Sequence, residues 1–157
     1  MEIRKRLLEL GLELPPCPQP VGAYVPGILA GGLLWTSGQL PLFKGELQYR
    51  GKLGQDLSVE EGYRAARLCA LNCLSVVEAM LGTLDRVARI VRVGGFVASG
   101  EGFTEQSKVL NGASELLHAL FGEKGKHVRS AVGVKELPLG APVEIELVVL
   151  VENTGRR

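Results

Sequence analysis

Arg129 is the residue with the clearest means of binding a small acidic molecule. It begins the segment RSAVGV, where the small side chains that follow leave room for a guanidinium to project into a cleft. The planar fork of a guanidinium matches both oxygens of a carboxylate. The residue types alone favour a plainer interpretation, a surface arginine paired with Glu144 or Glu146.

Other candidate sites lack the spacing that their chemistry requires. Ser37 is not within the G-x-S-x-G pattern of a nucleophilic serine. Cys69 and Cys73 are conceivable metal ligands with His118 and His127, but the chain has neither a C-x-x-C nor an H-E-x-x-H motif. Two cysteines on the apolar face of a helix more often belong to the core. We therefore expect no metal and no organic cofactor.

Composition and charge exclude several classes of protein. The chain has 157 residues, of which 46% are hydrophobic and 22% charged, and a net charge of +1. This balance argues against a non-specific nucleic-acid binder, which needs clustered cations, and against wholesale disorder. The 3 cysteines do not make a disulfide framework. No apolar run is long enough for a membrane span or an export signal, so we expect a cytoplasmic protein with no membrane partner.

Hydrophobic periodicity and turn residues predict alternating strands and helices. Ser58 and Glu61 form a capping box at the start of the clearest helix, and Gly82 suits its end. Thr104 is the candidate cap of a second long helix, which Gly122 ends. The expected elements are a helix at 2–10, a proline-rich connector at 15–20, two strands within 21–38 around a Pro26–Gly27 turn, a loop at 39–57 with a short strand near Leu47–Tyr49, a helix between Ser58 and Gly82, a strand at Val87–Ala98, a helix from about Glu105 to Phe121, and strands at Ser130–Val134 and Val143–Val151.

This order predicts an α+β architecture, one mixed sheet with two helices on one face. The odd-numbered residues of Val143–Val151 are all apolar and suit the helix-covered face, while Glu144, Glu146, Val148 and Leu150 face the other way. The second face is too apolar at Val148 and Leu150 to be simply solvated. We therefore expect other copies of the same chain to cover it.

Three segments, in order and with characteristic spacing, carry a resemblance to a known family. They are VGAYVPG followed by TSGQLP (Val21–Gly27 and Thr36–Pro41), KVLNGASELLHALFG (Lys108–Gly122) and RSAVGVKELPLGAPVEIE (Arg129–Glu146). With these segments the chain resembles the reactive intermediate deaminase family, also called the RidA/YjgF or L-PSP endoribonuclease family, from Pro20 to Val151. The expected organisation is an N-terminal helix and proline-rich arm at 1–20, one family domain at 21–152 and a tail at 153–157.

The resemblance implies a fold, an assembly and a reaction. The family fold is a chorismate-mutase-like sheet with two helices on one face, and three copies form a homotrimeric barrel with clefts between subunits. The best-characterised branch hydrolyses reactive 2-imino and enamine acids to 2-keto acids and ammonia, which limits metabolite damage. No cofactor takes part. The implied partners are a small carboxylate substrate and further copies of the chain.

The resemblance also assigns roles to individual residues. Arg129 corresponds to the arginine that binds the substrate carboxylate, and Glu144 to the glutamate that holds the attacking water. The expected cleft residues are Tyr24, Ser37, Gly38, Asn111 and Ala131. Ala131 departs from the family, whose deaminase branch often has cysteine there. The N-terminal arm and the longer 39–57 loop suggest a side branch.

Two other functions stay open at the level of sequence. The same cleft and Arg129 would serve a non-catalytic sensor of small carboxylates. Some members of the family are described as endoribonucleases or translation inhibitors, but the net charge of +1 and the 5% aromatic content give little support for RNA binding.

Overall fold

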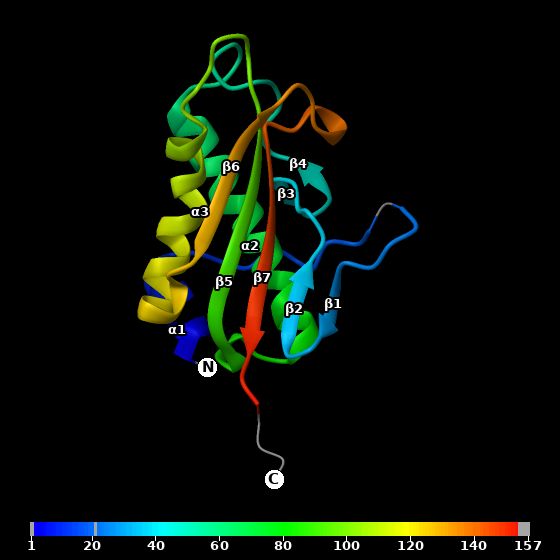
Figure 1. The fold of residues 1–157 in the computed structure, drawn as a ribbon, viewed down its shortest axis with the longest axis vertical. Helices are drawn as coiled ribbons and strands as arrows, with labels where there is room; N and C mark the ends of the chain where they lie inside the picture. The colour runs from blue at the N-terminus through cyan, green and yellow to red at the C-terminus, as the bar shows by residue number, and fades with distance from the viewer. Residues whose placement is uncertain (1, 21, 154–157) are drawn as a thin grey trace.

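Three helices and seven strands form the part of the chain that the computed structural model describes, residues 2–20 and 22–153 (Figure 1). The helices are α1 (Glu2–Glu9), α2 (Val59–Leu81) and α3 (Gln106–Phe121). The strands are β1 (Gly27–Ala30), β2 (Leu33–Thr36), β3 (Leu42–Phe43), β4 (Glu46–Leu47), β5 (Val87–Ala98), β6 (Val128–Val134) and β7 (Val143–Val151). Short 3-10 turns occupy Leu84–Arg86, Gly122–Gly125 and Pro138–Gly140.

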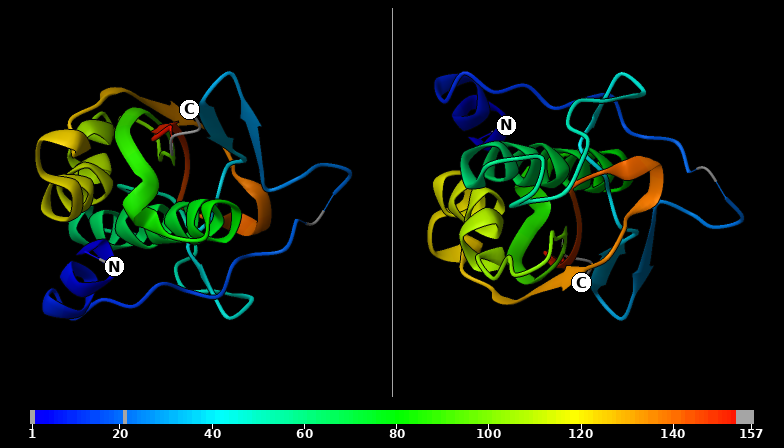
Figure 2. Two further views of the ribbon diagram at one scale, coloured as in Figure 1. Left: turned by 90° about the horizontal axis from the view of Figure 1, so that it is seen from below. Right: turned by 90° about the horizontal axis from the view of Figure 1, so that it is seen from above.

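Five of the strands make one mixed sheet in the order β1-β2-β7-β5-β6, and β3 pairs with β4 separately. Neighbours in the large sheet are antiparallel except β5 and β6, which are parallel because α3 connects them as a crossover. Helices α2 and α3 lie on one face and leave the other uncovered (Figure 2). The predicted α+β architecture is confirmed.

The ends of α2 follow the local signals in the sequence. The Ser58 hydroxyl accepts from the amide of Glu61, and the Glu61 carboxylate accepts from the amide of Ser58, so the predicted capping box is present. Gly82 ends the helix with φ +88°, a left-handed conformation that glycine adopts at low cost. Within residues 2–20 and 22–153, no helix, α2 included, is both long and apolar enough to pass through a bilayer.

The core lies between the sheet and helices α2 and α3. Strand β7 alternates as predicted, with Val143, Ile145 and Val149 fully buried on the helix side. Cys69 and Cys73 of α2 are also fully buried, and each thiol lies against a backbone carbonyl of β7. These cysteines are core residues, and no three His, Cys, Asp or Glu side chains gather as a metal site among the described residues.

The first hairpin turns later than the sequence predicts. Gly27 lies in β1 opposite Thr36, so the prediction of a turn at Pro26–Gly27 is wrong. The turn is Gly31–Gly32, where φ is +61° and +81°. Two residues with positive φ match the twist of the flanking strands, and glycine reaches this conformation without strain. Val21, the first residue of the predicted strand region, lies outside the described residues.

Three smaller predictions differ from the structure in detail. The 39–57 segment is mostly loop as expected, and the short strand predicted near Leu47–Tyr49 is β4, shifted to Glu46–Leu47. It pairs with β3 around Lys44–Gly45, a partner that the sequence did not predict. Helix α3 begins after Glu105, which makes no side-chain capping bond, so Thr104 is not its cap. Strand β6 begins at Val128, two residues before the predicted start.

The N-terminal segment packs against helices α2 and α3. Ile3 and Leu7 of α1 are buried in the core, and the carboxylate of Asp85 accepts from the first amides of α1. Beyond α1 the chain runs along α2, where the hydroxyl of Ser75 donates to the carbonyl of Pro15. The proline-rich arm therefore reaches the edge of the sheet along a fixed path (Figure 2).

Candidate functional site

The guanidinium of Arg129 is held against helix α3 by three hydrogen bonds. Its Nη1 donates to Asn111 Oδ1 at 2.9 Å and to Ser114 Oγ at 3.1 Å, and its Nη2 donates to the Ser107 carbonyl at 3.4 Å. Asn111 and Ser114 lie one turn apart, so both face the strand that carries Arg129. The structure thus brings together Arg129 and Asn111, which the sequence placed in one cleft.

The charge of Arg129 has only neutral partners among the described residues. The three hydrogen-bond acceptors are the side-chain amide of Asn111, the hydroxyl of Ser114 and the backbone carbonyl of Ser107. The ion pair with Glu144 or Glu146 that the residue types favoured is absent from the described residues, and Glu146 lies 3.5 Å from Arg92 instead. A half-buried cation that neutral groups orient and no carboxylate neutralises is suited to bind an anion.

His127 extends this network behind Ser114. Its Nδ1 lies 2.6 Å from the carbonyl of Gly125, and its Nε2 lies 2.8 Å from Ser114 Oγ. A carbonyl only accepts, so Nδ1 carries the proton, and in the neutral ring Nε2 accepts from the hydroxyl. Burial lowers the pKa of His127, and the charges of His118 and Arg129 lower it further, while the bond to Gly125 opposes them.

Sequence reasoning missed both His127 and Ser114. It considered His127 only as a conceivable metal ligand and did not consider Ser114. A usable signal was present, because Ser114 follows Asn111 by three positions on a helix and His127 precedes Arg129 by two positions at a strand. Both spacings place the paired residues on one side of their element.

Glu144 forms the second part of the candidate site, on the opposite face of the sheet. Its side chain is half-buried and lies so close to Gly38 that a Cβ at Gly38 would overlap the carboxylate. Reciprocal backbone hydrogen bonds between Gln39 and Ile145 hold the Gly38 segment in this position. Burial raises the pKa of Glu144, and the nearby charge of Glu146 raises it further.

A cavity of about 160 Å³ opens in front of Glu144. Tyr24 and Gly38 line it, so two of the predicted cleft residues meet Glu144 there. Ser37 is next to this cavity in sequence, but its hydroxyl donates to the carbonyl of Val25 at 2.6 Å. The remaining lining residues are mostly apolar and include the end of the N-terminal arm: Pro18, Gln19, Pro20, Pro26, Gln39, Leu40, Leu42, Pro138 and Leu139.

One copy of the chain does not bring Arg129 and Glu144 together. Arg129 pairs with Val93 and Glu144 with Phe96, on the two sides of β5. The two residues are therefore two strand spacings apart, about 10 Å sideways, and their side chains leave opposite faces of the sheet. Ala131 lies two residues after Arg129 on the same side of β6 and packs against the core.

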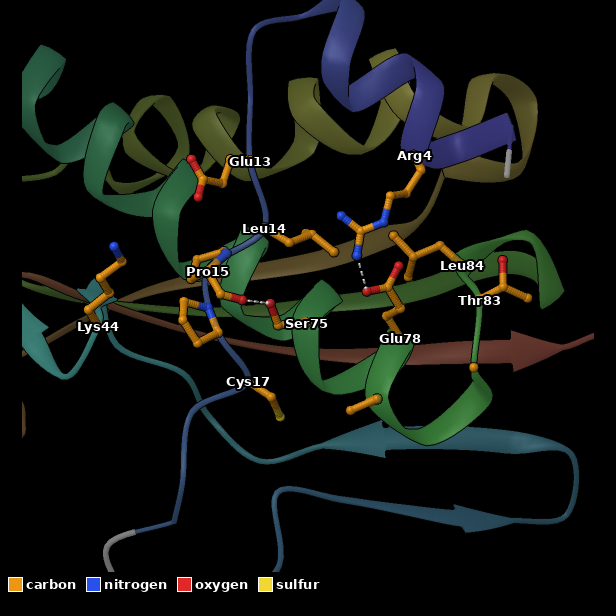
Figure 3. A pocket seen from close by; sticks show the side chains of 13 residues that line it. Arg4, Glu13, Leu14, Pro15, Cys17, Lys44, Ser75, Glu78, Thr83 and Leu84 are labelled. Atoms are coloured by element: carbon orange, nitrogen blue, oxygen red, sulfur yellow. Dashed lines mark hydrogen bonds and ion pairs between the residues drawn. The ribbon is translucent and has the colours of Figure 1, made fainter.

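A larger cavity, of about 550 Å³, contains none of the predicted site residues (Figure 3). It lies between the N-terminal arm and the end of α2, and an ion pair of 2.6 Å between Arg4 and Glu78 borders it. Arg4 and Glu78 are paired with each other, and the charged side chains of Glu13 and Lys44 also line this cavity.

Comparisons with known proteins find relatives over most of the chain. Residues 4–151 match the family model described as "YjgF/chorismate mutase-like, putative endoribonuclease". The chain is 46% identical over 152 residues to Protein TCP17 of Trypanosoma cruzi, covering 96% of this chain and 95% of that protein. It is 28% identical over 142 residues to a 2-iminobutanoate/2-iminopropanoate deaminase of Dermatophagoides farinae, covering 90% and 95%. The solved structure of Atu1372 from Agrobacterium tumefaciens, of unknown function, has 44% identity and a TM-score of 0.90 over 96% of this chain and 94% of that one.

Proposed function

Since this chain belongs to the YjgF/chorismate mutase-like family, we propose that it hydrolyses reactive 2-imino and enamine acids to 2-keto acids and ammonia. The observation that carries this proposal is Arg129, a fixed guanidinium without a carboxylate partner among the described residues. The relative from Dermatophagoides farinae is named a 2-iminobutanoate/2-iminopropanoate deaminase, and this name supports the same class of substrate. Each of these molecules carries a carboxylate next to its C=N bond.

The proposed site is shared between two copies of the chain. Arg129 of one copy binds the carboxylate, and Glu144 of a second copy faces the C=N carbon. Apolar side chains on the uncovered face of the sheet support such an assembly, because water would otherwise contact them. They are Ile28, Trp35, Val128, Val132 and Leu150, and all are at least 40% exposed. A homotrimer that buries this face, as the family resemblance implies, would place one copy's β6 edge beside another's β7 face.

The chemistry needs a held substrate, one water molecule and one base. Glu144 accepts a hydrogen bond from the water and takes its proton as the oxygen attacks the imine carbon. The proton passes from Glu144 to the imine nitrogen, which gives the amino alcohol. Glu144 then moves the hydroxyl proton to the nitrogen as the C–N bond breaks, and this releases the 2-keto acid and ammonia. Its raised pKa makes Glu144 a stronger proton acceptor than an ordinary carboxylate. Anchoring by Arg129 contributes through proximity and orientation.

Imine hydrolysis in the presence of the protein tests this function. An amino-acid oxidase generates 2-iminobutanoate in solution, and the release of ammonia and keto acid is followed with and without this chain. We expect acceleration by the wild type and its loss in Arg129→Lys, because an ammonium does not match the bidentate carboxylate. Arg64→Lys, on the exposed side of α2, is the matched control and should keep full activity.

Two alternative results would identify other functions. Thermal stabilisation by 2-oxobutanoate without any acceleration would indicate a carboxylate-binding protein that is not an enzyme. Cleavage of single-stranded RNA that depends on Arg129 and weakens with salt would indicate a nuclease. Either result would overturn the proposed deaminase.

A further inference from the structure

The guanidinium of Arg129 is oriented by a series of hydrogen bonds that begins outside strand β6. The series runs from the carbonyl of Gly125 through both ring nitrogens of His127 to Ser114 Oγ, and from there to Arg129 Nη1. We propose that Ser114 and His127 are positioning residues, which hold Arg129 in the orientation that captures a carboxylate. This inference rests on the role of Arg129 in the proposed function.

The donor and acceptor in each hydrogen bond explain how His127 influences the orientation of Arg129. A serine hydroxyl has one hydrogen, and neutral His127 accepts it at Nε2. The oxygen lone pairs of Ser114 are then free to accept from Arg129. Without an acceptor at position 127, the hydroxyl can rotate, and its hydrogen would compete with the hydrogens of the guanidinium. His127 therefore acts on Arg129 through Ser114.

The same network selects which edge of Arg129 a ligand can use. Both hydrogens of Nη1 are donated, one to Asn111 and one to Ser114, and Nη2 donates once to the Ser107 carbonyl. The Nε hydrogen and the second Nη2 hydrogen have no partner among the described residues. Two free donors on one guanidinium suit the two oxygens of a carboxylate.

The surroundings of His127 favour the neutral ring that this arrangement requires. The ring of His118, from α3, lies with its centroid 5.9 Å away, and Arg129 approaches from β6. Both groups are or can become cations, so both oppose a positive charge on His127, and burial lowers its pKa in the same direction.

Calorimetric binding of 2-oxobutanoate tests the inference with matched variants. Ser114→Ala and His127→Leu should raise Kd about three- to tenfold, the range for one hydrogen bond. Ser114→Thr and His127→Gln keep a hydroxyl and an acceptor respectively, so they should restore most of the affinity. Arg64→Lys lies on the exposed side of α2, away from this network, so it should not change Kd.

Coupling to Arg129 separates positioning from a general structural effect. In an Arg129→Gln background, Ser114→Ala should cause no further loss of affinity, because the group it positions is gone. In turnover assays the same variants should raise KM and leave kcat unchanged. Equal effects of Ser114→Ala with and without Arg129, or no effect of any of these variants, would overturn the inference.

A readout without ligand keeps the inference apart from the proposed function. Nuclear magnetic resonance of the arginine side chains should show slow rotation of the Arg129 Nη groups in the wild type and fast rotation in Ser114→Ala and His127→Leu. If rotation changes as expected but the wild type binds no carboxylate, the proposed function fails and the positioning role stands. If rotation is the same in all three proteins, the positioning role is wrong.

Discussion

Arg129 and Glu144 leave opposite faces of one sheet, from strands that lie on either side of β5. Arg129 turns toward α3, where Asn111 binds it, and Glu144 turns toward the uncovered face. A small substrate that contacts both residues therefore contacts two copies of the chain. This relationship makes the proposed activity a property of an assembly, and it can be tested without a structure of that assembly.

Mixing two inactive variants should restore activity. Arg129→Ala and Glu144→Gln each remove one part of every site, and we expect each pure variant to be inactive. After subunit exchange, a site is intact when its Arg129 comes from a Glu144→Gln subunit and its Glu144 from an Arg129→Ala subunit. This holds for about one quarter of the sites in a random mixture. Imine hydrolysis is measured before and after exchange. A mixture that stays inactive, although mixed oligomers form, would exclude a shared site.

Activity should fall on the acid side at a higher pH than for an ordinary glutamate. Glu144 must be ionised to accept the proton from water, and burial followed by the charge of Glu146 raises its pKa. The rate therefore decreases as pH falls through this raised pKa. Glu146→Gln removes the second cause and should move the acid limb to lower pH. The pH profile of kcat/KM, corrected for uncatalysed hydrolysis, measures both.

Glu144→Gln should raise the melting temperature at pH 7 while it abolishes turnover. Because the pKa of Glu144 is raised in the folded state, the folded chain binds this proton more tightly than the unfolded chain. Its contribution to stability is therefore favourable at low pH and is lost as pH rises through the folded pKa. The neutral amide of the Glu144→Gln variant avoids that loss. The difference in melting temperature between the variant and the wild type should therefore disappear at about pH 4, where the ordinary glutamate pKa lies. Calorimetry at the two pH values tests this sign.

Gly38→Ala should reduce activity far more than stability. The added methyl group would overlap the carboxylate of Glu144. Because this side chain is flexible and only half-buried, it can move away at a cost of about 1 kcal/mol or less. The displaced carboxylate no longer holds the water, and a loss of about 100-fold in kcat is expected for such a misplacement. A melting curve and a rate measurement on the same preparation separate the two effects.

Local signals in the sequence predicted most of the fold. The ends of α2 follow from Ser58 and Gly82, whose capping interactions involve only neighbouring residues. The hairpin turn was misplaced because Pro26–Gly27 and Gly31–Gly32 are both turn signals. The choice between them depends on how β1 pairs with β2, which is a property of the sheet.

The candidate site was only partly predictable. Residue types alone pointed to Arg129, whereas Asn111 came from a resemblance, and the structure shows the two side chains in contact. Ser114 and His127 were missed because the contact between them joins a helix to the segment before a strand, and hydrophobic periodicity carries no information about polar partners. The separation of Glu144 from Arg129 depends on the strand order, which the sequence pattern does not determine.

The N-terminal arm carries none of the reacting groups, yet Pro18 and Pro20 form a wall of the space before Glu144. They reach it because α1 and Pro15 fix the preceding chain along α2. The walls of this space therefore include a segment that lies outside the sheet and outside helices α2 and α3. Members of this family that differ in their first twenty residues would then accept ligands of different size.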